Sequence, residues 1–209
     1  MKTLVIGANG QIGRQFCEIA SRAGVPIRAM IRHPDQQTWF RERGIETTIA
    51  DLEGDLRHAF HGCDQAIFTA GSGPHTGPDK TLMIDLHGAI RCIDLAVELG
   101  LERFVMVSAL RASDPLAAPE KMRPYMAAKF AADAYLRNAH VPHVILKPAR
   151  LTDEPATRQV STSIRSAPAL DVSRGNVAHA LTYLAQARTL KNREFDLLDG
   201  ESTIAMALV

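Results

Sequence analysis

The chain has 209 residues, which at roughly 150 residues per domain predicts one domain with modest additions. Its 24 Lys and Arg residues nearly balance 23 Asp and Glu residues, so the net charge of +1 provides no overall field to attract nucleic acid or an anionic membrane. A hydrophobic content of 46%, with 14 Gly and 11 Pro, is ordinary for a globular protein and excludes a disordered or collagen-like chain.

The start of the chain has only a short apolar run, which ends at Gly7. This run is too short for a signal-peptide core or a membrane span, so the sequence predicts a soluble cytoplasmic protein. The three cysteines, Cys17, Cys63 and Cys92, have no CxxC spacing, and we expect them to be reduced and buried. The histidines lack the HExxH spacing and a third ligand, so no metal site is predicted.

Short apolar runs alternate with longer segments of helical periodicity through nearly the whole chain. The predicted strands are rich in Val, Ile, Leu or Phe, as are strands buried on both faces, and they cover residues 3–6, 27–31, 47–50, 66–69, 104–108, 144–147 and 195–198. The predicted helices lie between them, at residues 11–23, 36–43, 54–61, 80–99, 125–138 and 175–187. This alternation predicts an α/β fold with a single Rossmann-type, doubly wound parallel sheet of about seven strands and helices on both faces.

No repeat, charge block or change in composition divides the chain, so residues 1–209 are expected to form a single domain. Two irregular stretches, residues 111–124 and 151–173, directly follow predicted strands. In open α/β sheets the ligand crevice lies outside the carboxyl ends of the strands, so we expect these stretches to cover a small-molecule substrate. The loop of residues 73–78 is a weaker candidate, in which His75 is either a substrate contact or a solvated side chain.

A glycine-rich turn joins the first predicted strand to the first predicted helix. Glycines allow a tight turn and a close approach of the backbone to a pyrophosphate, and the free N–H groups at the helix start favour its charge. Because the turn lies within a βαβ unit, a dinucleotide site is the preferred interpretation over a plain strand-to-helix turn. The predicted cofactor contacts in this turn are Gly7, Asn9, Gly10, Gln11, Ile12 and Gly13.

Arg32 directly follows the second predicted strand, nineteen residues after Gly13. NAD sites commonly have an acidic residue near this position to bind the ribose hydroxyls, whereas an Arg suits a 2′-phosphate. Arg32 therefore predicts NADP, rather than NAD, as the cofactor. The alternatives are that Arg32 is a solvated surface residue, or that Arg14 or Arg28 shares or takes over its role.

Two further strand ends carry residues that suit the same cofactor. Asp51 and Leu52 follow the third strand, where the carboxylate can accept from the adenine amino group while the leucine covers the ring. A helix N-cap is an equally weighted interpretation of Asp51. The small residues Ala70, Gly71 and Ser72 follow the fourth strand and can let the chain pass close to the middle of the cofactor, with an ordinary glycine loop as the alternative.

Tyr125 and Lys129 are four residues apart, which places them on the same face of a helix. A nearby ammonium stabilises a phenolate, so a tyrosine in this position can donate or accept a proton near neutral pH. Ser108, at the end of the fifth strand, can hydrogen-bond a reacting carbonyl beside Tyr125. These three residues are the candidate catalytic set.

The glycine turn and the Ser–Tyr–Lys set resemble the atypical, NAD(P)H-binding branch of the short-chain dehydrogenases/reductases, which is similar to NAD-dependent epimerases/dehydratases. Residues 147–151, Lys-Pro-Ala-Arg-Leu, resemble the branch's Arg-Pro-Gly stretch and add Pro148 to the expected cofactor contacts. Residues 173–178, Ser-Arg-Gly-Asn-Val-Ala, resemble its Ser-Arg-x-Asp-Val-Ala segment. The resemblance covers essentially the whole chain and implies strand order 3-2-1-4-5-6-7, NADP binding, and Lys129 on the nicotinamide ribose.

Three residues depart from the pattern of the branch. Lys147 and Ala149 replace its Arg and Gly, and Asn176 replaces its Asp. Some members of the branch lack a working catalytic set and act as cofactor-sensing regulators, but this chain keeps all three groups, which favours an enzyme.

The sequence therefore predicts an NADP-dependent oxidoreductase that couples hydride transfer to Tyr-based proton transfer on a small carbonyl, quinone or flavin-like substrate. A non-catalytic, NADP(H)-sensing regulatory protein is the alternative. An epimerase or dehydratase acting on a nucleotide sugar fits less well, because a chain this short leaves little beyond the core to hold such a substrate. We expect a monomer or a small homo-oligomer.

Overall fold

Seven parallel strands form most of the central sheet, in the order β3-β2-β1-β4-β5-β6-β10, with β3 at one edge. The computed structural model describes residues 1–73 and 75–209. The observed strand order confirms the predicted α/β class and the order that the resemblance implies. The seven strands are β1 (Thr3–Ile6), β2 (Ile27–Ile31), β3 (Glu46–Ile49), β4 (Gln65–Phe68), β5 (Arg103–Val107), β6 (His143–Pro148) and β10 (Arg193–Asp199).

The prediction that residues 151–173 lack regular structure was wrong. β8 (Gln159–Ser161) pairs antiparallel with β10, and β11 (Ser202–Thr203) pairs with β8, so the sheet has nine strands. β7 (Arg150–Thr152) and β9 (Asp171–Ser173) form a second, parallel pair. Each of these strands has only two or three residues, too few to show a hydrophobic alternation, so only the pairing partners define them.

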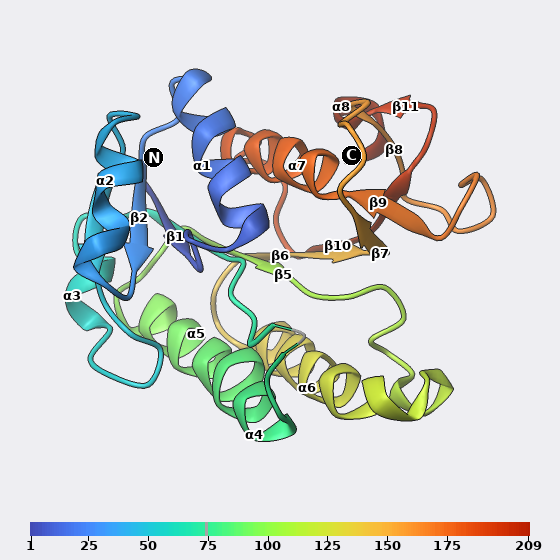
Figure 1. Ribbon diagram of the computed structural model, residues 1–209, viewed down its shortest axis with the longest axis horizontal. Helices are drawn as coiled ribbons and strands as arrows, with labels where there is room; N and C mark the ends of the chain where they lie inside the picture. The colour runs from blue at the N-terminus through green and yellow to red at the C-terminus, as the bar shows by residue number, and fades with distance from the viewer. Residues whose placement is uncertain (74) are drawn as a thin grey trace.

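Helices cover both faces of the sheet (Figure 1). Three pack on one face, namely α1 (Gln11–Arg22), α2 (Gln37–Arg41) and α7 (Arg174–Gln186). Three pack on the other, namely α3 (Arg57–Phe60), α5 (Ala89–Glu98) and α6 (Arg123–Asn138). Along β1, Val5 joins the first core while Leu4 and Ile6 join the second, as the two-residue period of a strand requires. The remaining short helices are η1 (Pro34–Gln36), α4 (Pro78–Lys80), η3 (Pro115–Ala117), η4 (Glu120–Met122) and α8 (Ile204–Ala207).

The helix predicted at residues 80–99 is not uniform. A π-helical segment, η2 (Thr81–Gly88), precedes α5, and such segments often occur at functional sites. Asp85 lies within η2 and is only 1% exposed. The hydrophobic period of the sequence does not distinguish a π-helical from an α-helical turn over so few residues, so this feature was not predicted.

A buried arginine fixes the far end of α7. The Arg103 guanidinium donates to the carbonyl oxygens of Ala187 at 2.6 Å and Leu190 at 3.3 Å, and also to that of Leu184. A cation at this position satisfies the last carbonyl groups of the helix and opposes the negative end of its dipole.

The three cysteines are buried, as predicted, and form no disulfide within the described part of the chain. Burial raises the pKa of each thiol above its ordinary value, which disfavours the reactive thiolate. No described helix is long and apolar enough to cross a membrane. Among residues 1–73 and 75–209, no cluster of three or more His, Cys, Asp or Glu side chains could hold a metal ion.

Candidate functional site

Most of the predicted site residues follow the carboxyl ends of neighbouring strands. Because these strands pair in parallel, their carboxyl ends lie along one edge of the sheet. Taken in sheet order from β3 to β6, the residues along this edge are Asp51, Arg32, Gly7, Ala70, Ser108 and Ala149. Positions spread over about two thirds of the sequence are thereby brought to one edge of the sheet, where open α/β folds bind their ligands.

The turn between β1 and α1 passes very close to the end of β4. Gly7 has a φ of +84°, and a Cβ added there would lie 2.5 Å from the backbone nitrogen of Ala70. A Cβ added at Gly13 would lie 2.3 Å from the Gly7 carbonyl oxygen. Both positions therefore require glycine.

We expect Gly13→Ala to destabilise the protein by about 1–3 kcal/mol and to weaken cofactor binding, because the added methyl group must displace the turn. Urea unfolding and NADPH fluorescence titration measure the two effects. Gly54→Ala is the matched control, since a Cβ there would lie no closer than 3.7 Å to the neighbouring atoms. If both variants behaved alike, the close packing of the turn would not be important.

The start of α1 suits an anionic group. No side chain among the described residues caps this helix at Gly10, and its first turn has no acidic residue. The Asn9 side chain could have competed with an anion for the free N–H groups at the start of this helix. It instead accepts from the Arg14 guanidinium at 2.6 and 2.9 Å. An uncapped start of a 12-residue helix behind a glycine turn fits the pyrophosphate of a dinucleotide.

The three arginines proposed for a 2′-phosphate differ in how they are held. Arg28 donates to Glu46 at 2.6 Å and to two backbone carbonyl oxygens, so it has a structural role. Arg14 is held by Asn9 and lies over the ring of Trp39, 5.1 Å from its centroid. Arg32 is exposed, and its guanidinium makes no hydrogen bond or ion pair with any residue that the structure describes.

The alternative interpretation of Asp51 as a helix N-cap was wrong. Its carboxylate accepts from the backbone N–H of Glu53 at 2.9 Å, in a tight turn, while the N-cap residue of α3 is Leu56. Leu52 is buried, and its Cδ1 would lie 3.2 Å from a Cβ added at Gly88. Leu52 therefore packs in the core beneath this edge of the sheet.

Lys129 is held by a carboxylate of η2 and by the last carbonyl oxygen of β5. Its Nζ is 3.3 Å from Asp85 Oδ1 and 3.3 Å from the carbonyl oxygen of Val107, and only 3% of the residue is exposed. The other Asp85 oxygen accepts from the backbone N–H of Ser72 at 2.9 Å. Burial opposes the charge of Lys129, but Tyr125 and Asp85 raise the pKa of its ammonium above the ordinary value. Sequence reasoning missed Asp85, whose only signal was a carboxylate within an otherwise apolar segment.

Tyr125 lies one helical turn before Lys129, as their spacing predicts. The Lys129 Nζ is 5.6 Å from the centroid of the tyrosine ring. Tyr125 is half-buried, and its hydroxyl makes no hydrogen bond to a described residue. This hydroxyl is consequently available to a ligand.

Ser108 does not direct its hydroxyl proton into the crevice. It is 4% exposed and donates to Asp133 Oδ2 at 2.8 Å. Asp133 is also buried, and its other oxygen has no partner among the described residues. Burial raises the pKa of Asp133, although Ser108 and nearby cations oppose this effect. Sequence reasoning missed Asp133 too, but its position four residues after Lys129 places it on the same helical stripe.

Comparison with known proteins assigns the chain to a family. Residues 7–188 match the model of the NAD(P)H-binding family. The chain belongs to this family. The resemblance inferred from the glycine turn is therefore confirmed at the level of the NAD(P)H-binding family.

Relatives of the whole chain carry related names. The chain is 40% identical to the uncharacterized sugar epimerase YhfK of Bacillus subtilis, covering 100% of this chain and 99% of that protein. A Bacillus halodurans structure, named as an NAD-dependent epimerase/dehydratase, is 37% identical with a TM-score of 0.94, covering 100% of this chain and 98% of that one. The triphenylmethane reductase of Citrobacter sp., solved with NADP(H), has the same fold with a TM-score of 0.72 at 18% identity, covering 96% of this chain and 71% of that one.

Two departures from the NAD(P)H-binding pattern have structural explanations. Lys147 forms an ion pair with Glu194 of β10 at 2.5 Å, so its ammonium is tied to the neighbouring strand. Asn176 donates to Asp199 Oδ1 at 2.6 Å, and its own side-chain oxygen accepts from the backbone N–H of Arg158 at 2.7 Å. An aspartate at position 176 would place two carboxylates together, so the amide suits this chain. Pro148 is buried at the end of β6, where its carbonyl oxygen accepts from Leu110 at 2.8 Å.

The loop predicted at residues 73–78 is described except for Pro74, which lies outside the described residues. His75 is exposed, which agrees with a solvated side chain. Residues 111–124 contain the short helices η3 and η4 and lead directly into α6, which carries Tyr125.

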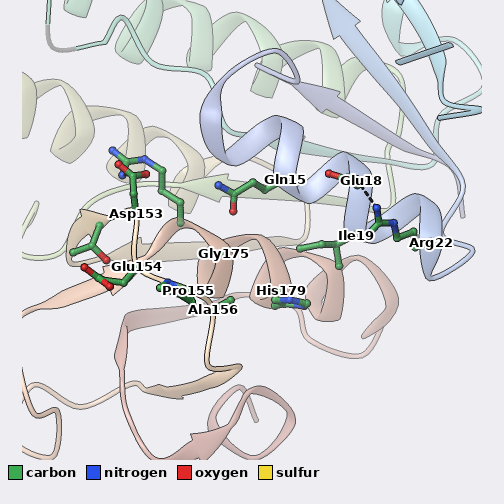
Figure 2. Close-up of a pocket in the computed structure, with 12 residues that line it drawn as sticks. Gln15, Glu18, Ile19, Arg22, Asp153, Glu154, Pro155, Ala156, Gly175 and His179 are labelled. Carbon is green, nitrogen blue, oxygen red and sulfur yellow. Dashed lines mark hydrogen bonds and ion pairs between the residues drawn. The ribbon is translucent and has the colours of Figure 1, made fainter. Parts of the chain in front are cut away.

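A cavity of about 290 Å³ lies between α1 and α7, and Figure 2 shows its lining. Residues 152–156, part of the stretch predicted to cover a substrate, line this cavity, but none of the predicted catalytic or cofactor-binding residues does. Several of its charged side chains pair with each other, since Arg22 contacts Glu18 at 2.6 Å and Arg174 contacts Asp153 at 2.8 Å. The cavity is thus separate from the edge that carries Tyr125 and Lys129.

Proposed function

We propose that this protein is an NADP-dependent oxidoreductase that reduces a small carbonyl, quinone or flavin-like substrate, with Tyr125 as the proton donor. The observation that carries the proposal is a Tyr125 hydroxyl without a hydrogen-bond partner among the described residues, one turn from a buried Lys129 ammonium. Both belong to the helix beside the edge at which an NAD(P)H-binding family member presents its glycine turn.

The roles of the residues follow from their positions. When bound, the nicotinamide cofactor supplies a hydride to the substrate carbon. Tyr125 donates its phenolic proton to the substrate oxygen, which yields the alcohol, and then recovers a proton from solvent. Lys129 stabilises the transient phenolate and directs an N–H toward the ribose hydroxyls. Asp85 and the Val107 carbonyl hold the ammonium in place for both tasks.

Oxidation of NADPH, followed by its absorbance, tests this proposal with nitrobenzaldehyde, menadione and riboflavin as probe substrates. Turnover of at least one probe, with saturation in NADPH, is the expected result. Tight NADPH binding without oxidation by any probe would contradict the proposed activity.

We propose that Arg32 sets the preference for NADP. A charge-assisted contact to the 2′-phosphate is worth about 1.5–3 kcal/mol, so Arg32→Ala should weaken NADP binding by about 10- to 150-fold and NAD binding little. Calorimetric titration with both nucleotides measures the effect. Arg41→Ala, another exposed arginine nearby in the sequence, should leave both affinities unchanged. Equal losses for the two nucleotides would contradict the role of Arg32.

A cofactor-sensing regulator is a second candidate, favoured by the orientation of Ser108 toward Asp133 rather than toward the crevice. This function predicts NADP(H) binding without turnover, and a partner whose affinity depends on the bound nucleotide. A pull-down that recovers the same partners with and without NADP would contradict it.

The names of two relatives favour a third candidate, an epimerase that retains its NAD. Such an enzyme oxidises and then reduces the same substrate, so it should be purified with bound nucleotide. Acid release and enzymatic assay of the nucleotide distinguish the cases. Stoichiometric NAD would favour the epimerase over the NADP-dependent oxidoreductase.

A further inference from the structure

The hydrogen bond of Ser108 limits what this residue can do in the proposed reaction. A serine hydroxyl has one proton, and Ser108 donates it to Asp133 Oδ2 at 2.8 Å. While this bond exists, Ser108 can only accept a hydrogen bond at the crevice and cannot donate to a substrate carbonyl. The position of Ser108 otherwise suits contact with a substrate carbonyl, because Ser108 directly follows Val107, whose carbonyl oxygen accepts from Lys129.

The surroundings of Asp133 disfavour a carboxylate. The residue is 1% exposed, and no cation lies within 4.0 Å of its oxygens among the residues that the structure describes. Three cations face it from α6 and β6, but each is paired with another carboxylate. The pairs are Lys129 with Asp85 of η2, and Arg137 and Lys147 with Glu194 of β10.

We propose that Asp133 is a positioning residue whose protonated form donates to Ser108 and thereby turns the Ser108 proton toward the substrate oxygen. This inference rests on the proposed oxidoreductase function. The reversal requires Asp133 to take up one proton from solvent, after which its carboxyl O–H donates to Ser108 and the Ser108 proton is free to turn; no proton passes between the two residues. The raised pKa of Asp133, caused by burial, agrees with a neutral carboxyl group.

The pH dependence of turnover tests the proposal. In the parent protein, kcat with a reducible probe should fall by about a hundredfold as pH rises and Asp133 ionises, because a hydrogen-bond donor to the developing oxyanion is lost. Asp133→Asn should remove this dependence while keeping activity near the low-pH value, because the amide does not ionise and its NH2 group can donate to Ser108 at every pH. Ser108→Ala should be slow at every pH.

Asp94→Asn provides the matched control, because Asp94 also accepts from a hydroxyl, that of Tyr135 at 2.6 Å, but at an exposed position. This variant should keep the parent pH profile. An Asp133→Asn variant with the parent profile, or with activity as low as Ser108→Ala, would overturn the proposal.

A second measurement does not depend on turnover. If the native state binds the Asp133 proton more tightly than the unfolded chain, this contribution to stability is complete at low pH and is lost as pH rises toward the native pKa. The unfolding constant of the parent, relative to Asp133→Asn, should therefore rise about tenfold per pH unit from the ordinary carboxyl pKa upward. A ratio that does not change with pH overturns the proposal, whether or not the parent reduces any probe.

Carbon-13 NMR of the aspartate carboxyl groups in the parent protein supplies the same information if Asp133→Asn does not fold. The Asp133 signal is assigned by its shift in Ser108→Ala. A protonated Asp133 at neutral pH supports the proposal, and an ionised one overturns it. If Asp133 is protonated but no probe is reduced, the proposed oxidoreductase function fails, and with it the use of Ser108 as a donor.

Discussion

Tyr125→Phe is expected to lower kcat for carbonyl reduction by about 10²- to 10⁴-fold, the usual contribution of general acid catalysis, while leaving NADPH affinity unchanged. The substitution removes only the phenolic hydroxyl, which has no described partner in the protein, so the fold and the position of Lys129 beside Asp85 should be retained. Steady-state NADPH oxidation with nitrobenzaldehyde measures kcat, and fluorescence titration measures the affinity for NADPH.

Tyr135→Phe is the control, because Tyr135 lies on the same helix and its hydroxyl donates to Asp94 at an exposed position. This variant should keep the parent activity. Undiminished carbonyl turnover by Tyr125→Phe would contradict the proposed mechanism. Loss of aldehyde reduction with unchanged menadione or riboflavin reduction would indicate direct hydride delivery, which needs little proton catalysis from the protein.

Asp85→Asn should lower the free energy of unfolding by about 3–5 kcal/mol, because it leaves the buried Lys129 ammonium without its counter-ion. Both side chains of this pair are at least 96% buried, with exposures of 4% and 1%. The amide keeps the size of the carboxylate and can still accept from Ser72, so the loss of charge is the main change. Urea unfolding at neutral pH measures the effect.

Glu98→Gln is the matched control for charge removal. Glu98 forms an ion pair with Arg57 in which the side chains are 58% and 46% exposed, respectively. Exposed pairs contribute about 0–1 kcal/mol, so this variant should be nearly as stable as the parent. If Asp85→Asn cost no more than Glu98→Gln, Lys129 would be neutral or solvated, and the electrostatic account of the crevice would be wrong.

Much of the sheet was predictable because its strands are buried on both faces and therefore appear as continuous apolar runs. β1 and β2 have the predicted bounds, and the other five parallel strands differ by one or two residues at each end. The parallel topology also explains why strand ends were sufficient to locate Arg32, Asp51 and Ser108 along one edge, since parallel strands present their carboxyl ends together.

The residues that contact these side chains were harder to predict from the sequence. The spacing of Tyr125 and Lys129 is a local property of one helix, and it requires no knowledge of the rest of the chain. The contact of Lys129 with Asp85 joins residues 44 positions apart, and that of Ser108 with Asp133 joins residues 25 apart. No local rule connects such positions, so neither carboxylate was among the predicted site residues.

The sequence by itself determined the apolar strand runs, the glycine turn and the helical stripe with Tyr125, because hydrophobic period, glycine conformation and helical spacing act over short distances. The strand order was expected only from the resemblance to a known family. Only the tertiary structure decided which charges are paired, that Arg28 is committed to Glu46 and backbone carbonyls, and that Ser108 faces Asp133. The physical reason is that burial and hydrogen-bond direction depend on every element packed around a side chain. These properties appear only when the helices and strands are assembled.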